Sequence, residues 1–160
     1  MTGTQNVNSL FCLYHITTLI ILFLFAVYDF RHHKIRNVHL YAFLFWCLFS
    51  LPLTAFIKSD TLWHVIFFHS LPGAFCGFST IFTAALLTHG GIGGGDIKLV
   101  TLLGFIYGTN GLVIILLISC AAIFVHFGLY RLLGKKILFA IPFAPYLFAG
   151  CTFYVLPNLC

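Results

Sequence analysis

Long apolar runs recur along the whole chain, and they restrict its fold more than any other feature. Their approximate limits are residues 10–28, 38–57, 62–88, 97–108, 111–130 and 137–156. A helix needs about 20 apolar residues to cross a bilayer. Only 7% of the residues are charged, whereas roughly a quarter are charged in soluble domains. The sequence therefore predicts an all-α, polytopic integral membrane protein with about six transmembrane helices in a single domain, 1–160.

Two of these runs have unusual lengths. The third run is long and contains Leu71-Pro72-Gly73, so we expect a kink in that helix. The fourth run is short: about 15 residues at 1.5 Å each cover roughly 22 Å of a hydrocarbon core about 30 Å thick. We therefore expect one end of the fourth helix to lie inside the membrane.

The basic residues predict the orientation of the chain. Six spans place all but one of them on the same side, and those residues are Arg31, Lys34, Arg36, Lys98, Arg131, Lys135 and Lys136, with Lys58 opposite. The positive-inside tendency makes this side cytoplasmic, so both termini face outward. Because the basic residues form short clusters at membrane boundaries, they predict contact with lipids and no nucleic-acid partner.

Two of the three acidic residues are expected on the cytoplasmic side. Asp29 ends the first span, Asp96 begins the fourth after Gly93-Gly94-Gly95, and Asp60 falls on the opposite side. A single carboxylate at a membrane boundary can simply be hydrated among lipid headgroups. Two carboxylates at one face, one of them behind a glycine run that permits close backbone approach, favour a functional site.

A pair of carboxylates supports aspartic-protease chemistry. Neighbouring carboxylates do not both ionise easily, so they share a proton, and one activates water while the other donates a proton. The helix ends favour Asp29 as the protonated member and Asp96 as the ionised base. The chain has no glutamate and hence no H-E-x-x-H site, and its histidines lack paired ligand spacing. We therefore predict neither a metal nor a cofactor.

Three motifs carry a resemblance to a known family. Residues 93–99, GGGDIKL, resemble the G-x-G-D-x-K-L signature of the type IV prepilin peptidases, which are GxGD aspartic endopeptidases of the bacterial inner membrane. Asp29 with Ile35 and Asn37 resembles the D-x5-I-P-N segment of that family, and residues 141–147, IPFAPYL, resemble its I-P-F-[GA]-P-F-L element. The motifs occur in the family's order and cover nearly the whole chain.

The resemblance implies a function and a set of site residues. It implies removal of the basic leader from type IV prepilins or pseudopilins at the cytoplasmic face, with Asp29 and Asp96 as the catalytic pair. The other residues that we assign to substrate binding or to shaping the site are Gly93, Gly95, Lys98, Asn37, Pro142 and Pro145. Lys98 can equally be an interfacial anchor whose ammonium group reaches the cytoplasm.

The sequence departs from the family at two points. Arg36 replaces the usual proline after Ile35, so the turn after Asp29 can differ in shape. The chain has no pair of C-x-x-C motifs, which many members carry in a segment linked to methyltransferase activity. We therefore expect the short form, with peptidase activity alone.

Three alternative functions remain open from the sequence. A small proton-coupled transporter would also use intramembrane carboxylates, although usually near the midplane and in repeated halves. A serine intramembrane protease would require a nucleophile, and Gly77-Phe78-Ser79-Thr80 matches its G-x-S-G motif only in part. An inactive family member could serve in assembly. Neither the individual prepilin nor the oligomeric state can be predicted.

Overall fold

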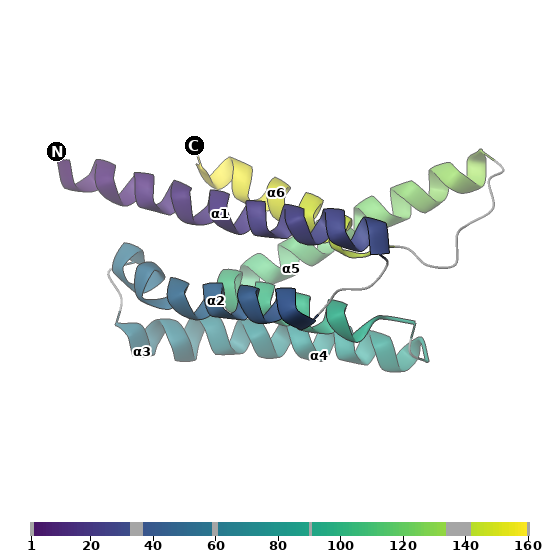
Figure 1. Cartoon of the computed structure of the whole chain (residues 1–160), viewed down its shortest axis with the longest axis horizontal. Helices are drawn as coiled ribbons and strands as arrows, with labels where there is room; N and C mark the ends of the chain where they lie inside the picture. Colours follow the sequence, from purple (N-terminus) through teal and green to yellow (C-terminus); the bar gives the residue numbers. More distant parts are fainter. Residues whose placement is uncertain (1, 33–36, 59–60, 90, 134–141, 160) are drawn as a thin grey trace.

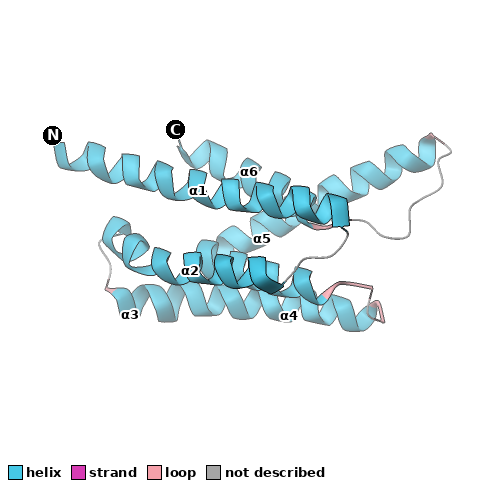
Figure 2. Cartoon of the chain, in the orientation of Figure 1, coloured by secondary structure: helices cyan, strands magenta, loops and turns pink. Residues whose placement is uncertain are grey.

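The computed structural model describes residues 2–32, 37–58, 61–89, 91–133 and 142–159, which form helices and no strand. Figures 1 and 2 show the helices as one elongated bundle. The elements in chain order are α1 (Thr2–His32), α2 (Asn37–Lys58), α3 (Leu62–His64), the π-helical turn η1 (Val65–Ser70), α4 (Leu71–Leu87), α5 (Gly94–Leu132) and α6 (Ala144–Leu159). The predicted all-α class is confirmed for the described residues.

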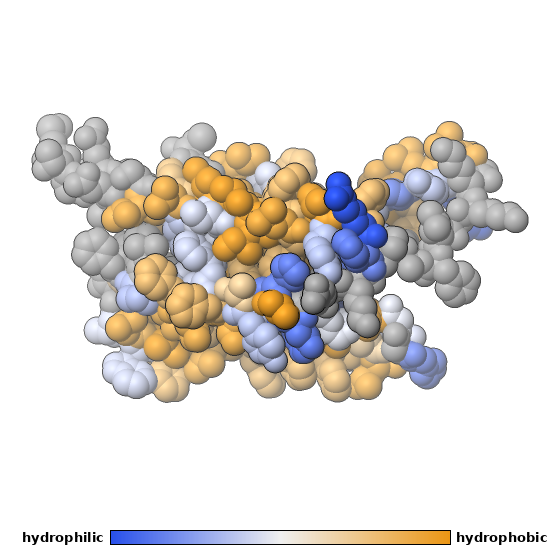
Figure 3. Space-filling view, viewed as in Figure 1, coloured by the Kyte–Doolittle hydropathy of each residue, from blue (hydrophilic) through white to orange (hydrophobic). Residues whose placement is uncertain are grey.

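Three described helical segments are long and apolar enough to cross a membrane. These are Leu10–His32, Leu62–Leu87 and Gly94–Leu132, and Asn37–Pro52 forms a shorter apolar helix. Large apolar side chains cover much of their outer surface, as Figure 3 shows, and Phe124 and Leu132 are examples with exposed fractions of 78% and 85%. Such a surface is stable in lipid, so the chain is a membrane protein. The count of about six spans stays a prediction.

The third apolar run is helical from Leu62 to Leu87, and its change of geometry lies one turn before the expected kink. Pro72 is in the first turn of α4, and the preceding turn, Val65–Ser70, is a π-helix. Proline lacks an N–H, so it cannot donate to the carbonyl four residues earlier. The N–H of Leu71 instead reaches Ile66, five residues back. The helix therefore continues through Pro72, with a wider π-helical turn directly before it.

Helix α5 consists of two arms that meet at Gly108. This residue has φ of 68° and ψ of −176°, which are not helical values. A Cβ atom on Gly104 would lie 3.0 Å from the Leu112 side chain, whereas eight residues of straight helix span about 12 Å. The chain therefore bends back at Gly108, close to the break that the sequence predicts between residues 108 and 111. The first arm, residues 94–107, is short as expected.

The first arm of α5 is the centre of the bundle. Leu99, Val100 and Leu103 on this arm are completely buried, and α5 contacts α2, α4 and α6. Helix α6 packs against α1 as well as α5, and its Leu147 and Cys151 are also completely buried. The predicted last span starts at residue 137, but α6 starts at Ala144, and residues 134–141 lie outside the described part of the chain.

Candidate active site

Three helix ends meet at one end of the bundle. Helix α1 ends there, while α5 and α6 begin there (Figure 1). Hydrophilic surface gathers at the same end, around the end of α1 and the start of α2 (Figure 3). Asp29 lies in the last turn of α1, and Asp96 lies in the first turn of α5. The structure thus brings together the two aspartates that the sequence singles out.

The carboxylate of Asp29 is buried and has a backbone partner. Its exposed fraction is 5%, and its Oδ2 atom accepts a hydrogen bond of 3.1 Å from the N–H of Ala144. Ala144 is the first residue of α6 and is itself 2% exposed. This bond joins residues 115 positions apart, so the start of α6 is part of the site.

Asp96 is half-buried, and the glycine before it shapes its surroundings. Gly93 caps the N-terminus of α5, and its carbonyl accepts the N–H of Asp96 at 3.0 Å. A Cβ atom on Gly93 would lie 3.3 Å from Asp96 Oδ2. The missing side chain of Gly93 therefore leaves room for the carboxylate. Asp96 also lies within electrostatic range of Asp29.

Two other predicted site residues contact each other. The ammonium group of Lys98 donates a hydrogen bond of 3.1 Å to Oδ1 of Asn37, and both side chains are exposed. This contact joins the start of α5 to the start of α2. Lys98 thus faces α2, which agrees with the rule that side chains two positions apart on a helix point to different faces.

The remaining predicted residues lie at the starts of α5 and α6. Gly95 is half-buried in the first turn of α5. Pro142 precedes α6, and Pro145 is its second residue, a position where a proline does not interrupt the helix. The other motif and charge positions lie outside the described residues, and they are Lys34, Ile35, Arg36, Asp60, Lys135, Lys136 and Ile141.

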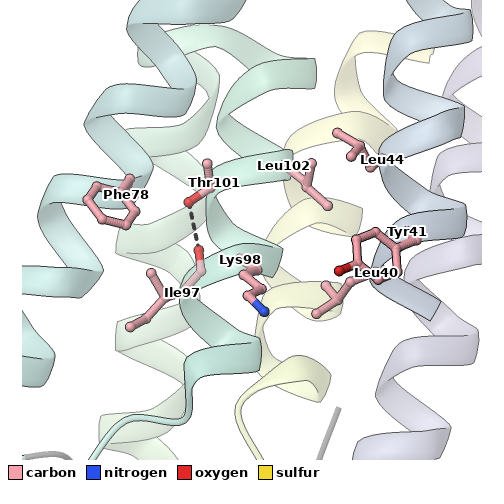
Figure 4. A pocket seen from close by; sticks show the side chains of 8 residues that line it. All are labelled: Leu40, Tyr41, Leu44, Phe78, Ile97, Lys98, Thr101 and Leu102. Carbon is pink, nitrogen blue, oxygen red and sulfur yellow. Dashed lines mark hydrogen bonds between the residues drawn. The ribbon is translucent and has the colours of Figure 1, made fainter. Parts of the chain in front are cut away.

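An apolar cavity of about 240 Å³ lies between α2, α4 and α5 (Figure 4). Leu40, Tyr41 and Leu44 line it from α2, and Phe78 lines it from α4. The α5 lining is Ile97, Lys98, Thr101 and Leu102, directly after Asp96. The cavity can hold an apolar side chain or part of a lipid tail beside the site.

The alternative nucleophile does not form a comparable site. The Ser79 hydroxyl donates a hydrogen bond of 3.1 Å to the carbonyl of Cys76, within its own helix. No group of three potential metal ligands among histidine, cysteine, aspartate and glutamate occurs within the described ranges. The arrangement that remains is a pair of carboxylates at the boundary of an apolar bundle, which can activate a water molecule by acid and base catalysis.

The sequence-based assignment of site residues does not include Ala144, whose N–H contacts Asp29. Ala144 has no functional side chain, so a search for chemically active side chains passes over it. Its position gave a signal nevertheless, because it directly precedes Pro145, and proline is favoured in the first turn of a helix. The free N–H groups of a helix commonly bind carboxylates.

Comparisons with known proteins identify the family of the chain. The sequence profile described as the Type IV leader peptidase family matches residues 16–128, which include both aspartates. The chain is also 36% identical over 88 residues to the "Prepilin leader peptidase/N-methyltransferase" of Bacillus subtilis (strain 168). That alignment covers 50% of this chain and 33% of the relative. No solved structure matches significantly. Because the profile spans well over half of its residues, the chain belongs to the type IV leader peptidase family.

Proposed function

We propose that the chain is an aspartic endopeptidase of the GxGD type that removes the basic leader from type IV prepilins or pseudopilins. The observation that carries this proposal is the meeting of Asp29 and Asp96 at one end of an apolar bundle, from helices far apart in the sequence. Membership of a leader peptidase family supports it, as does the similarity to a Bacillus subtilis protein named as a prepilin leader peptidase.

The proposed location is the bacterial inner membrane, with the site at the cytoplasmic face. Each aspartate is followed two positions later by a basic residue: Arg31 follows Asp29, and Lys98 follows Asp96. Basic residues concentrate on the cytoplasmic side of membrane proteins. Prepilin leaders are basic by this proposal, and they would meet the enzyme on that side. The chain termini would then face outward.

In the proposed mechanism the two carboxylates divide the work on one peptide bond. One carboxylate takes a proton from a water molecule, and the resulting hydroxide attacks the carbonyl carbon. The other carboxylic acid donates its proton to the carbonyl oxygen. Collapse of the tetrahedral intermediate breaks the C–N bond: the amine leaves with a proton from the first residue, and a hydroxyl group of the intermediate returns a proton to the second residue, which restores both residues. The reaction consumes one water molecule and needs no further reactant.

The test is leader removal by purified protein in nanodiscs, with a prepilin as substrate and mass spectrometry of the products. We expect wild-type protein to cleave once, before the apolar segment of the substrate. Asp29→Asn and Asp96→Asn should each lower the rate by at least about 1,000-fold, because each removes a group that exchanges a proton. Ser79→Ala is the matched control and should retain the wild-type rate.

Other outcomes distinguish the alternatives. Cleavage that survives both aspartate substitutions would contradict the proposal, and loss with Ser79→Ala alone would favour a serine protease. Absence of cleavage together with aspartate-dependent proton uptake into proteoliposomes would favour a transporter. Absence of both activities in wild-type protein would favour a role in assembly.

A further inference from the structure

In the first turn of α6, one backbone N–H group donates a hydrogen bond to a residue outside the helix. The first N–H groups of a helix have no partner within it. In α6, the second residue is Pro145, which has no N–H, and the N–H of Tyr146 donates to the carbonyl of Phe143 at 3.1 Å. The N–H of Ala144 therefore remains, and it donates to Oδ2 of Asp29 at 3.1 Å.

This N–H group is held firmly relative to both neighbouring helices. Ala144 is 2% exposed and Leu147 is completely buried, so the first turn of α6 is packed into the core. The hydroxyl of Tyr146 lies 2.9 Å from Nδ1 of His126 on the second arm of α5, at hydrogen-bond distance. The donor is thus fixed against α1, which carries Asp29, and against α5, which carries Asp96.

We propose that Ala144 is a positioning residue of the active site, acting through its backbone N–H. The hydrogen bond fixes Oδ2 of Asp29 and leaves Oδ1 to act on the water molecule shared with Asp96. This inference rests on the peptidase function proposed above, and it assigns a role to a residue whose side chain is a single methyl group. Donors that are already in place cost no reorganisation during the reaction, which is why they contribute strongly to catalysis.

Replacing one backbone atom tests the proposal directly. Lactic acid incorporated at position 144 by nonsense suppression, during cell-free synthesis into nanodiscs, keeps the methyl group and replaces the N–H with an oxygen atom. Lactic acid at position 149 is the matched control, because Ala149 is an alanine in the same helix and its N–H lies inside the helix. Gel filtration of each product measures the folded fraction.

The two esters should behave differently in leader cleavage. We expect the ester at 144 to lower kcat by roughly 10-fold to 100-fold, the effect of losing a hydrogen bond to a charged group, with KM close to the wild-type value. The pH–rate profile of this ester should also be displaced along the pH axis. A smaller folded fraction alone would lower the rate by the same factor at every pH. The ester at 149 should match wild type in both respects. Equal behaviour of the two esters would overturn the proposal.

An infrared measurement makes this test independent of the peptidase function. The chain has three aspartates and no glutamate, so its side-chain carboxyl bands are few, and Asp29→Asn identifies the band of Asp29. We expect the ester at 144 to shift that band and the ester at 149 to leave it unchanged. An unshifted band would overturn the positioning role even in an active enzyme. If the band shifts but the wild-type protein cleaves no prepilin, the hydrogen bond between Ala144 and Asp29 is supported and the proposed peptidase function is contradicted.

Discussion

Gly73 of α4 and Gly104 of α5 lie backbone against backbone, so that a Cβ atom on either residue would overlap the carbonyl oxygen of the other. One helical turn further along α4, a Cβ atom on Gly77 would lie 2.8 Å from the carbonyl oxygen of Val100. These glycines let the first arm of α5 approach α4 closely. Because Asp96 begins that arm, the contact contributes to the placement of the carboxylate.

Gly104→Ala should destabilise the protein. The obstacle to the new methyl group is a backbone carbonyl, which cannot rotate away as a side chain can, so α4 and α5 must separate. We expect a loss of about 1–3 kcal/mol, the usual cost of overpacking a core. Thermal unfolding in detergent, followed by circular dichroism, measures it. Gly128→Ala is the control, because nothing lies within 4 Å of a Cβ atom there, and it should not lower the stability.

Gly108→Ala should be destabilising for two separate reasons. The combination of φ 68° and ψ −176° at this bend is accessible almost only to glycine and costs alanine about 1–3 kcal/mol, and a Cβ atom would lie 2.7 Å from Nε2 of His69. Adding His69→Ala removes the ring but leaves the backbone strain. The double variant should therefore recover only part of the loss, measured against His69→Ala alone in the same unfolding experiment. Full recovery would show that the bend itself is unstrained.

Gly93→Ala should slow leader cleavage while the protein stays folded. The new methyl group would lie 3.3 Å from Asp96 Oδ2, so the carboxylate must move by a few tenths of an ångström. Small displacements of reacting groups are costly, and we expect a decrease in kcat of about 3-fold to 10-fold. Gly94→Ala provides the comparison, since a Cβ atom there meets nothing within 4 Å. Equal rates in the two variants would contradict this account of Gly93.

Lys98→Met and Asn37→Ala should have the same small effect. Both remove the one hydrogen bond of 3.1 Å between these exposed side chains, so each should cost less than about 1 kcal/mol and slow cleavage only a few-fold. The double variant should be no worse than either single variant, because the two residues act through one contact. A loss of about 100-fold in Lys98→Met alone would instead indicate that Lys98 acts on the substrate.

The sequence was sufficient to predict those features that depend on composition and on order along the chain. The apolar runs predicted an all-α membrane protein, and the break after residue 108 predicted the bend in α5. The kink expected at Pro72 stays a prediction, and the sequence did not indicate that a π-helical turn can accommodate the missing N–H beside it. That possibility depends on the whole helix and its neighbours rather than on the local sequence.

The meeting of the two carboxylates in the candidate site was predictable from the sequence. Charge and topology were enough to expect Asp29 and Asp96 at one face, but the contact with Ala144 arises from tertiary packing of α6 against α1. The assignment of Asp29 as the protonated member stays a prediction. That prediction considered only the helix to which each aspartate belongs, whereas the ends of two helices, with opposite partial charges, act on Asp29.

The contact between Asp29 and Ala144 can form only late in the synthesis of the chain. Asp29 and Asp96 both precede α6 in the sequence, so a nascent chain already holds the two carboxylates of the candidate site while the amide that fixes one of them does not yet exist. If the proposed peptidase needs that amide for full activity, the growing polypeptide would cleave only weakly throughout insertion. Full activity would then arise only after α6 has packed against α1, which makes the last helix a checkpoint on the proposed cleavage.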